Sequence, residues 1–147
     1  MHKVALLSVG KVKTPSFADA CALYLDRIGH QCDFDDRILC AGSANEERER
    51  ILKALEKVEG IIVSLDETGK ESSSREFAAF IGKHRDTGTP VTFVLGGAYG
   101  LNDAIRSKAS HVMALSRMTF PHELCKLIFL EQLYRAGEIL KGSGYHH

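Results

Sequence analysis

Glycines cluster directly after an apolar run of this chain. Gly96, Gly97 and Gly100 follow the β-rich run VTFVL at residues 91–95. Glycine at a strand end lets backbone amides and carbonyls approach a ligand closely, and the helix start expected after Leu101 adds further donors. The GGxxG spacing differs from the GxGxxG pattern of dinucleotide-binding folds, so it fits a ligand-binding loop and a structural turn equally well.

Two other apolar runs end in residues that could join this loop in a binding site. The run IIVSLD at residues 61–66 has the features of a buried parallel strand and ends in Leu65 and Asp66, and the run HVMALS leads into residues 116–120. Ligands of parallel sheets bind at the carboxyl ends of the strands. We therefore expect the three segments to meet at one edge of a sheet and to hold a ligand there.

Titratable side chains near the C-terminus are the candidates for proton transfer. His122 stands at an expected helix start, where it could act on a substrate or simply pack or cap the helix. Arg135 has the spacing to pair with Glu131 one turn earlier, and His146 could belong to a frayed terminus. His146 and His147 lack the carboxylate or thiol spacing of a zinc set, so the sequence predicts no metal site.

The helix that carries these residues is apolar on nearly all sides. Pro121 fits its first turn, because the amide hydrogen that proline lacks would have no partner there, and Glu123 complements the positive helix start. Such a helix must be covered by central burial or by a second copy of itself, and we favour a homodimer. A polar stripe is formed only by Glu131, Arg135 and Glu138, and the apolar positions are Leu124, Leu127, Ile128, Phe129, Leu130, Leu133, Tyr134, Ile139 and Leu140.

The rest of the chain alternates between strands and helices. Residues 4–10 predict a buried strand, residues 32–40 an edge strand, and residues 67–73 a polar loop. The charges of EERER at residues 46–50 predict a solvated helix face. Helix starts are marked by Thr14 with Pro15, by Ser43 with Glu46, by Ser73 with Glu76 and by Asn102.

This alternation predicts an α/β fold with a mostly parallel sheet and helices on both faces. The chain has 147 residues and no segment that looks like a linker, so we expect one domain over residues 1–147.

The composition is that of an ordinary globular protein, with 44% hydrophobic residues, 26% charged residues and a formal net charge of +0. Neutrality excludes a polycation that coats nucleic acid through bulk charge, so any RNA contact must be local. The four cysteines lack CxxC spacing, and no secretory leader precedes them, which predicts free thiols in a cytoplasmic protein. The apolar runs fall short of the roughly 20 residues that span a bilayer, so no membrane insertion is expected.

Several long segments together resemble the ribosomal RNA large subunit methyltransferase H family of the SPOUT superfamily. The segments are FVLGGAYGL, LSRMTFPHELCKLIFLEQLYRAGEIL and GSGYHH, supported by VALLSVGK at the start and by SLDETGKESSSREFA in the middle. The chain departs from the family pattern at Lys126, where arginine is usual, and at His147, where lysine is frequent. Residues 31–59 show little resemblance beyond a charged helix.

This resemblance implies a SPOUT-type fold with a C-terminal trefoil knot, a homodimer, and S-adenosylmethionine as the methyl donor. The implied reaction is methylation of N3 of a pseudouridine in 23S ribosomal RNA on the assembled ribosome. A nucleotide-binding module without methyl transfer and a purely structural dimer are the alternatives from other functional classes. The implied cofactor-binding residues are Leu65, Gly96, Gly97, Gly100, Leu115, Ser116, Arg117, Met118, Thr119 and Phe120.

The resemblance also directs attention to the end of the chain. Candidates for catalysis are His122, Arg135, Tyr145 and His146, and the tail is expected to reach across the dimer. The N3 hydrogen of the target base must leave, so a base or a group that stabilises charge is required near the bound substrate. No single residue is assigned as the base.

Overall fold

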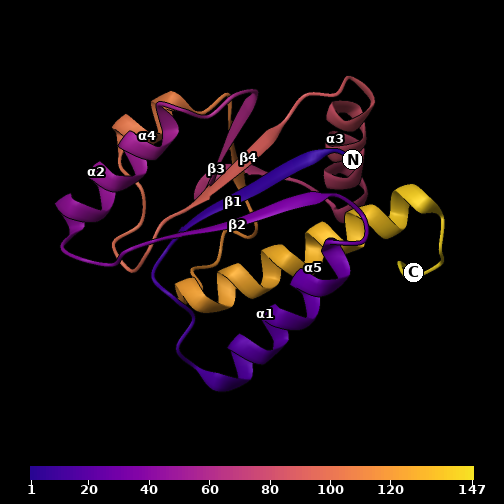
Figure 1. The fold of residues 1–147 in the computed structure, drawn as a ribbon, viewed down its shortest axis with the longest axis horizontal. Helices are drawn as coiled ribbons and strands as arrows, with labels where there is room; N and C mark the ends of the chain where they lie inside the picture. The colour runs from indigo at the N-terminus through magenta and orange to yellow at the C-terminus, as the bar shows by residue number, and fades with distance from the viewer.

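The computed structural model describes residues 1–147 as alternating strands and helices around one sheet (Figure 1). The elements in chain order are β1 (Lys3–Val9), α1 (Pro15–Ile28), β2 (Asp33–Leu39), α2 (Ala44–Leu55), β3 (Ile61–Glu71), α3 (Ser74–Asp86), β4 (Val91–Leu95), α4 (Asp103–Lys108), β5 (His111–Ala114) and α5 (His122–Lys141). The five strands have the order β2-β1-β4-β3-β5, and every pair is parallel. The predicted α/β class and the edge position of β2 are confirmed.

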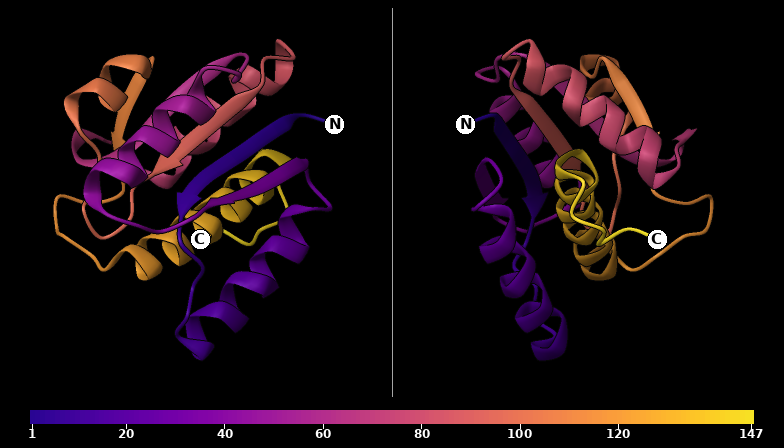
Figure 2. Two further views of the ribbon diagram at one scale, coloured as in Figure 1. Left: turned by 60° about the vertical axis from the view of Figure 1, so that its left-hand side comes forward. Right: turned by 90° about the vertical axis from the view of Figure 1, so that its right-hand side faces the viewer.

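Alternate side chains of the central strands pack into two separate cores, one on each face of the sheet. Leu6 and Phe93 belong to the core formed with α1, α3 and α5, whereas Leu7 and Val94 belong to the core formed with α2 and α4. Figure 2 shows the resulting layers from two further directions. The prediction of helices on both faces is therefore confirmed. The trefoil knot stays a prediction.

Strand β3 is longer than the sequence suggested. Residues 67–71 continue the strand, so the expected polar loop over residues 67–73 is wrong for most of its length. The register of the β3–β5 pair shifts between Leu65 and Lys70, which lets the exposed extension pair with the end of β5. An added Cβ on Gly69 would lie 2.6 Å from the carbonyl carbon of Val112, so this close pairing requires glycine. The sequence did not predict this extension because its side chains are polar and do not enter a core, so no apolar pattern marks the strand.

The predicted helix starts are confirmed, and three of the four have their capping hydrogen bonds. Thr14 is the N-cap of α1 ahead of Pro15, but its side chain makes no capping hydrogen bond. Ser43 with Glu46 and Ser73 with Glu76 form complete capping boxes, and the Asn102 side chain accepts a hydrogen bond from the Ile105 amide. The expected solvated face of α2 is wrong at Glu47. Only 6% of that residue is exposed, and its carboxylate accepts a hydrogen bond of 3.0 Å from the Gly42 amide.

Helix α5 lies between α1 and α3 on one face of the sheet. Pro121 is its N-cap, one residue before the predicted position. Glu123 lies in the first turn, and its carboxylate also accepts hydrogen bonds of 2.9 and 3.1 Å from the amides of Lys13 and Thr14. It thereby joins the start of α5 to the start of α1. These bonds lower the pKa of Glu123, chiefly through the Lys13 amide.

The sequence pattern missed one buried charge on α5. Lys126 is 4% exposed, and its Nζ lies 3.0 Å from Asp36 Oδ1 on the edge strand β2. A buried ammonium requires such a partner because desolvation is costly. No helix in the structure has the length and apolar character needed to cross a membrane.

Candidate functional site

A cavity of about 620 Å³ lies where β4, β5 and the buried part of β3 end. The three segments expected to meet at one edge of the sheet do so, because parallel strands bring their carboxyl ends together. A volume of this size is within the range of small-molecule and cofactor sites, roughly 300–1,000 Å³. The predicted cofactor residues that line it are Leu65, Gly96, Gly97, Gly100, Leu115, Ser116, Met118, Thr119 and Phe120.

Arg117 is the exception among the predicted cofactor residues. It does not line the cavity, its side chain is 85% exposed, and its Nε lies 2.7 Å from Glu71 Oε1. The extended β3 provides that partner, which the sequence did not predict. The structure therefore places Arg117 on the outer surface of the loop that follows β5.

The three glycines after β4 are required for three different reasons. An added Cβ on Gly96 would lie 2.7 Å from the carbonyl carbon of Gly100, within the loop itself. On Gly97 it would lie 2.7 Å from the Oε1 of the buried Glu47. Gly100 has open space around it but adopts a φ of +67°, a left-handed conformation that favours glycine. The segment is thus a tightly folded loop whose own packing shapes the cavity.

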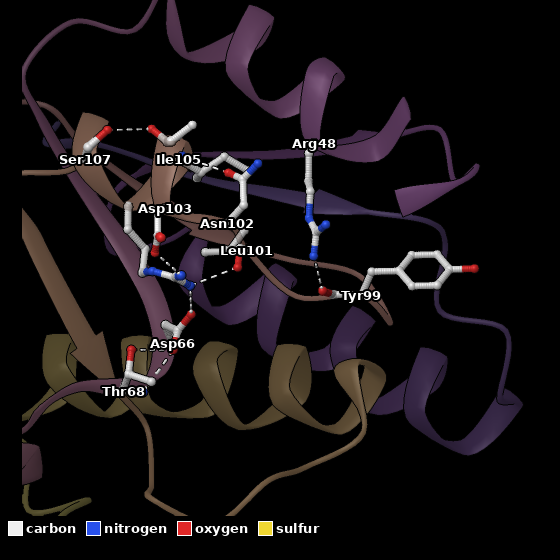
Figure 3. Close-up of polar contacts among 11 residues, drawn as sticks. Arg48, Asp66, Thr68, Tyr99, Leu101, Asn102, Asp103, Ile105 and Ser107 are labelled. Carbon is white, nitrogen blue, oxygen red and sulfur yellow. Dashed lines mark hydrogen bonds and ion pairs between the residues drawn. The ribbon is translucent and has the colours of Figure 1, made fainter. Parts of the chain in front are cut away.

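Two acidic residues, Asp66 and Glu67, line the cavity beside Leu65. Asp66 Oδ1 accepts hydrogen bonds from the amide and hydroxyl of Thr68, and its Oδ2 lies 2.9 Å from the Arg106 guanidinium (Figure 3). Burial raises the pKa of Asp66, but these hydrogen bonds outweigh burial and lower it overall. Asp66 is therefore a carboxylate at neutral pH with both oxygens occupied. The sequence placed Asp66 with Leu65 at a strand end that was expected to hold a ligand, and Asp66 lines the cavity there.

A second acidic side chain connects two walls of the cavity. The Thr119 hydroxyl donates a hydrogen bond of 2.5 Å to Glu67 Oε2, which joins the β3 extension to the loop after β5. Ser116 Oγ accepts a hydrogen bond from the Met118 amide within that loop. Glu67 has a neutral partner, unlike Asp66, so its negative charge is not balanced by a cation. The cavity wall therefore suits a ligand that carries positive charge.

The four predicted catalytic residues fall into two groups. His122 lines the cavity at the start of α5. Arg135, Tyr145 and His146 form a separate cluster, with Arg135 Nη1 3.0 Å from His146 Nδ1 and the guanidinium carbon 4.9 Å from the centre of the Tyr145 ring. Arg135 and His122 both lie on α5, and a rise of about 1.5 Å per residue places them roughly 20 Å apart. Within one chain, the tail cluster is thus remote from the cavity.

The tail cluster is held by local contacts on α5 and α1. Figure 2 shows the chain folding back alongside α5 after the helix ends. The Tyr145 ring packs edge-on against Tyr134 at 5.0 Å, and burial raises the Tyr145 pKa. Arg135 pairs with Glu131 at 2.8 Å as expected, and this bond raises the Arg135 pKa. The cluster therefore presents a permanent cation and a neutral phenol.

No group of three or more His, Cys, Asp or Glu side chains in the structure is arranged to hold a metal ion. Cys125, which also lines the cavity, has a thiol whose pKa is raised by burial, then by the nearby charge of Glu67. It is therefore a poor nucleophile at neutral pH.

Known proteins resemble this chain over nearly its whole length. A family model described as "Predicted SPOUT methyltransferase" matches residues 2–146. A protein named "Ribosomal RNA large subunit methyltransferase H" from Nitratidesulfovibrio vulgaris strain Miyazaki F is 43% identical, over 100% of this chain and 100% of that protein. A protein of the same name from Parabacteroides distasonis is 36% identical, over 99% of each. Among solved structures, the SpoU methyltransferase AviRb from Streptomyces viridochromogenes, in complex with AdoMet, has a TM-score of 0.48 at 13% identity, covering 91% of this chain and 57% of that one.

Proposed function

The chain belongs to the SPOUT methyltransferase family, and we propose that it transfers a methyl group from S-adenosylmethionine to N3 of a pseudouridine in 23S ribosomal RNA on the assembled ribosome. The observation that carries this proposal is the cavity at the strand ends, which gathers nine of the residues implied by the family resemblance: Leu65, Gly96, Gly97, Gly100, Leu115, Ser116, Met118, Thr119 and Phe120.

The residues around the cavity fit this cofactor. S-adenosylmethionine supplies a methyl group on a positively charged sulfonium. The carboxylate of Glu67, whose partner is a neutral hydroxyl, complements that charge, and the glycine loop exposes backbone groups to an adenosine. The Asp66 carboxylate is already occupied by Thr68 and Arg106, so it serves to fix the cavity wall.

The nitrogen that accepts the methyl group must lose its proton, and few groups can assist. His122 provides the one imidazole that lines the cavity. Arg135 and His146 lie too far from the cavity of their own chain, so we propose that the tail of a second copy completes the site. A composite surface also explains how a neutral chain selects RNA, since bulk charge cannot provide the affinity.

We predict that the purified protein labels ribosomes that lack the modification when it is given S-adenosylmethionine with a labelled methyl group. Mapping should place the label on N3 of a pseudouridine in 23S RNA, and stripped 23S RNA should be labelled poorly, because recognition requires the preformed ribosomal surface. Cofactor binding without transfer to either substrate would contradict the proposal and support a nucleotide-binding module.

The proposed dimer has a specific face on α5. Leu124 and Ile128 are partly exposed, lie one turn apart, and do not pack against either core of the chain. Phe129, another apolar position of α5, is 0% exposed, and its ring centre lies 4.8 Å from that of Phe93, so it belongs to the core and not to this face. Phe129→Asp would disrupt the core rather than an interface.

We predict that Ile128→Asp converts a dimer into a folded monomer, because a charge would have to be buried between the two helices. Light scattering at micromolar concentration measures the change, and circular dichroism checks the fold. Ile38→Asp is the matched control, since Ile38 is 41% exposed on the edge strand β2. An unmodified protein that is monomeric under these conditions would refute the dimer.

A further inference from the structure

The glycine loop at residues 96–101 is closely packed but contains few backbone hydrogen bonds of its own. Its one internal backbone hydrogen bond joins the Gly100 amide to the Gly97 carbonyl at 3.0 Å. Two other carbonyls of the loop, those of Tyr99 and Leu101, accept hydrogen bonds from arginine side chains (Figure 3). The arginines come from α2 and α4, two helices that contact each other on the same face of the sheet.

Arg106 on α4 connects three partners at once. Its Nη1 donates to Leu101 O at 2.8 Å and to Asp66 Oδ2 at 2.9 Å, and its Nη2 donates to Asp103 Oδ1 at 2.5 Å. Asp66 directly follows Leu65 at the end of the buried part of β3. A single guanidinium therefore joins two of the three segments that form the cavity. The planar fork of arginine makes this possible, whereas lysine offers only one nitrogen.

Arg106 is poorly suited to bind an anionic group of a ligand itself. It is flanked by the carboxylates of Asp66 and Asp103, so the cluster of three side chains has a net charge of −1. The hydrogen bond to Asp103 is the main cause of its raised pKa, which keeps the guanidinium charged. Arg106 also lines the cavity, but its Nη1 donates to Leu101 and Asp66, and its Nη2 donates to Asp103. This arrangement fits a structural support better than a ligand contact.

Arg48 on α2 supports the loop from the opposite side. Its Nη2 donates to Tyr99 O at 2.8 Å, while its Nε is buried without a partner. The neighbouring Glu47 packs beneath Gly97. Figure 3 shows the Tyr99 ring pointing away from these contacts, so the carbonyl is what Arg48 holds. Arg48 donates one hydrogen bond, whereas Arg106 donates three, so the contribution of Arg48 should be the smaller.

We propose that Arg106 and Arg48 are positioning residues for the cofactor: they hold the glycine loop in its binding conformation from two helices without touching the reacting atoms. This inference rests on the proposed methyltransferase function. Without Arg106 the Leu101 carbonyl loses its partner and Asp66 loses its cation, so the loop and the end of β3 are no longer joined. The cofactor would then have to reorder both segments when it binds.

The test is Arg106→Met, which keeps the length of the side chain and removes its donors. We expect the KM for S-adenosylmethionine to rise about tenfold, the size of effect that follows from one unsatisfied buried polar group. The kcat at saturating cofactor should stay within about twofold, because the chemistry is not altered. Arg106→Lys should restore only part of the loss, and Arg48→Met should raise KM in the same direction by less.

Arg85→Met is the matched control, because Arg85 forms an exposed ion pair with Asp86 at the end of α3. Calorimetry with S-adenosylhomocysteine gives the binding constants independently of turnover. If the unmodified protein binds neither cofactor form, the proposed function itself fails. If it binds and Arg106→Met binds equally well, only the positioning role is refuted. A kcat loss that persists at saturation would also refute it, by placing Arg106 in the chemistry. If Arg106→Met does not fold, the same measurements on Arg48→Met decide.

Discussion

Gly96→Val is expected to lower the affinity for S-adenosylmethionine by about a hundredfold or more. The Cβ of any side chain at this position would lie 2.7 Å from the Gly100 carbonyl carbon and 2.9 Å from its oxygen. Both atoms belong to the backbone, so the loop must move as a whole to relieve the clash. If moving the loop costs about 2.8 kcal/mol, the affinity falls about a hundredfold. The valine therefore weakens binding by distorting the loop. Filling space that the ligand needs is a smaller effect.

Isothermal calorimetry on the folded variant is the direct measurement. Gly29→Ala is the control glycine variant, because an added Cβ there meets only ordinary contacts of 3.4 and 3.5 Å. Circular dichroism and thermal melting should show that Gly96→Val retains the sheet, since Leu101 is the one residue of the loop that belongs to a core. An unchanged binding constant in a folded Gly96→Val protein would remove this cavity as the cofactor site.

Much of the fold could be predicted from local patterns whose physical meaning is unambiguous. Capping boxes at Ser43 and Ser73 satisfy the free amides of a helix start and have few other uses. The extension of β3 over residues 67–71 could not be predicted, because its residues are polar and exposed. Strand pairing there depends on β5, whose position is set by the sheet order. Only the assembled sheet reveals that partner.

The site was predictable where topology alone determines it. Strand ends converge in any parallel sheet, so the segments at Leu65, Gly96 and Leu115 could be assigned to one cavity without coordinates. Arg48 could not be identified, because a charge within EERER resembles a solvated helix face until the loop that it contacts is placed. The sequence also could not show why each glycine is required. Only the structure shows which atoms an added Cβ would contact.

Because the tail cluster lies far from His122, removing the tail should impair methyl transfer without disturbing the cavity. Removing residues 142–147 should reduce methyl transfer to ribosomes by at least about a hundredfold, the usual contribution of acid–base groups. Cofactor binding and dimerisation should be largely retained, because the cavity and the α5 face lie elsewhere. Methyl incorporation is measured at equal cofactor saturation for the full-length and truncated proteins. Equal rates would show that Tyr145 and His146 have no catalytic role. Ser143→Ala is the control that keeps the tail.

A mixed dimer tests whether the tail acts on the cavity of its partner. Gly142 and Gly144 adopt φ values of +72° and +81°, so the tail turns back along its own α5 and stays roughly 20 Å from its own cavity. One protomer carries the truncation but an intact cavity, and the other carries Gly96→Val but an intact tail. If the tail acts across the dimer, one complete site forms and the mixture regains activity that neither parent shows. If the tail acts within its own chain, no complete site exists and the mixture stays inactive. Restored methylation would therefore require the composite site, because neither chain alone holds both an ordered glycine loop and the Arg135–His146 pair.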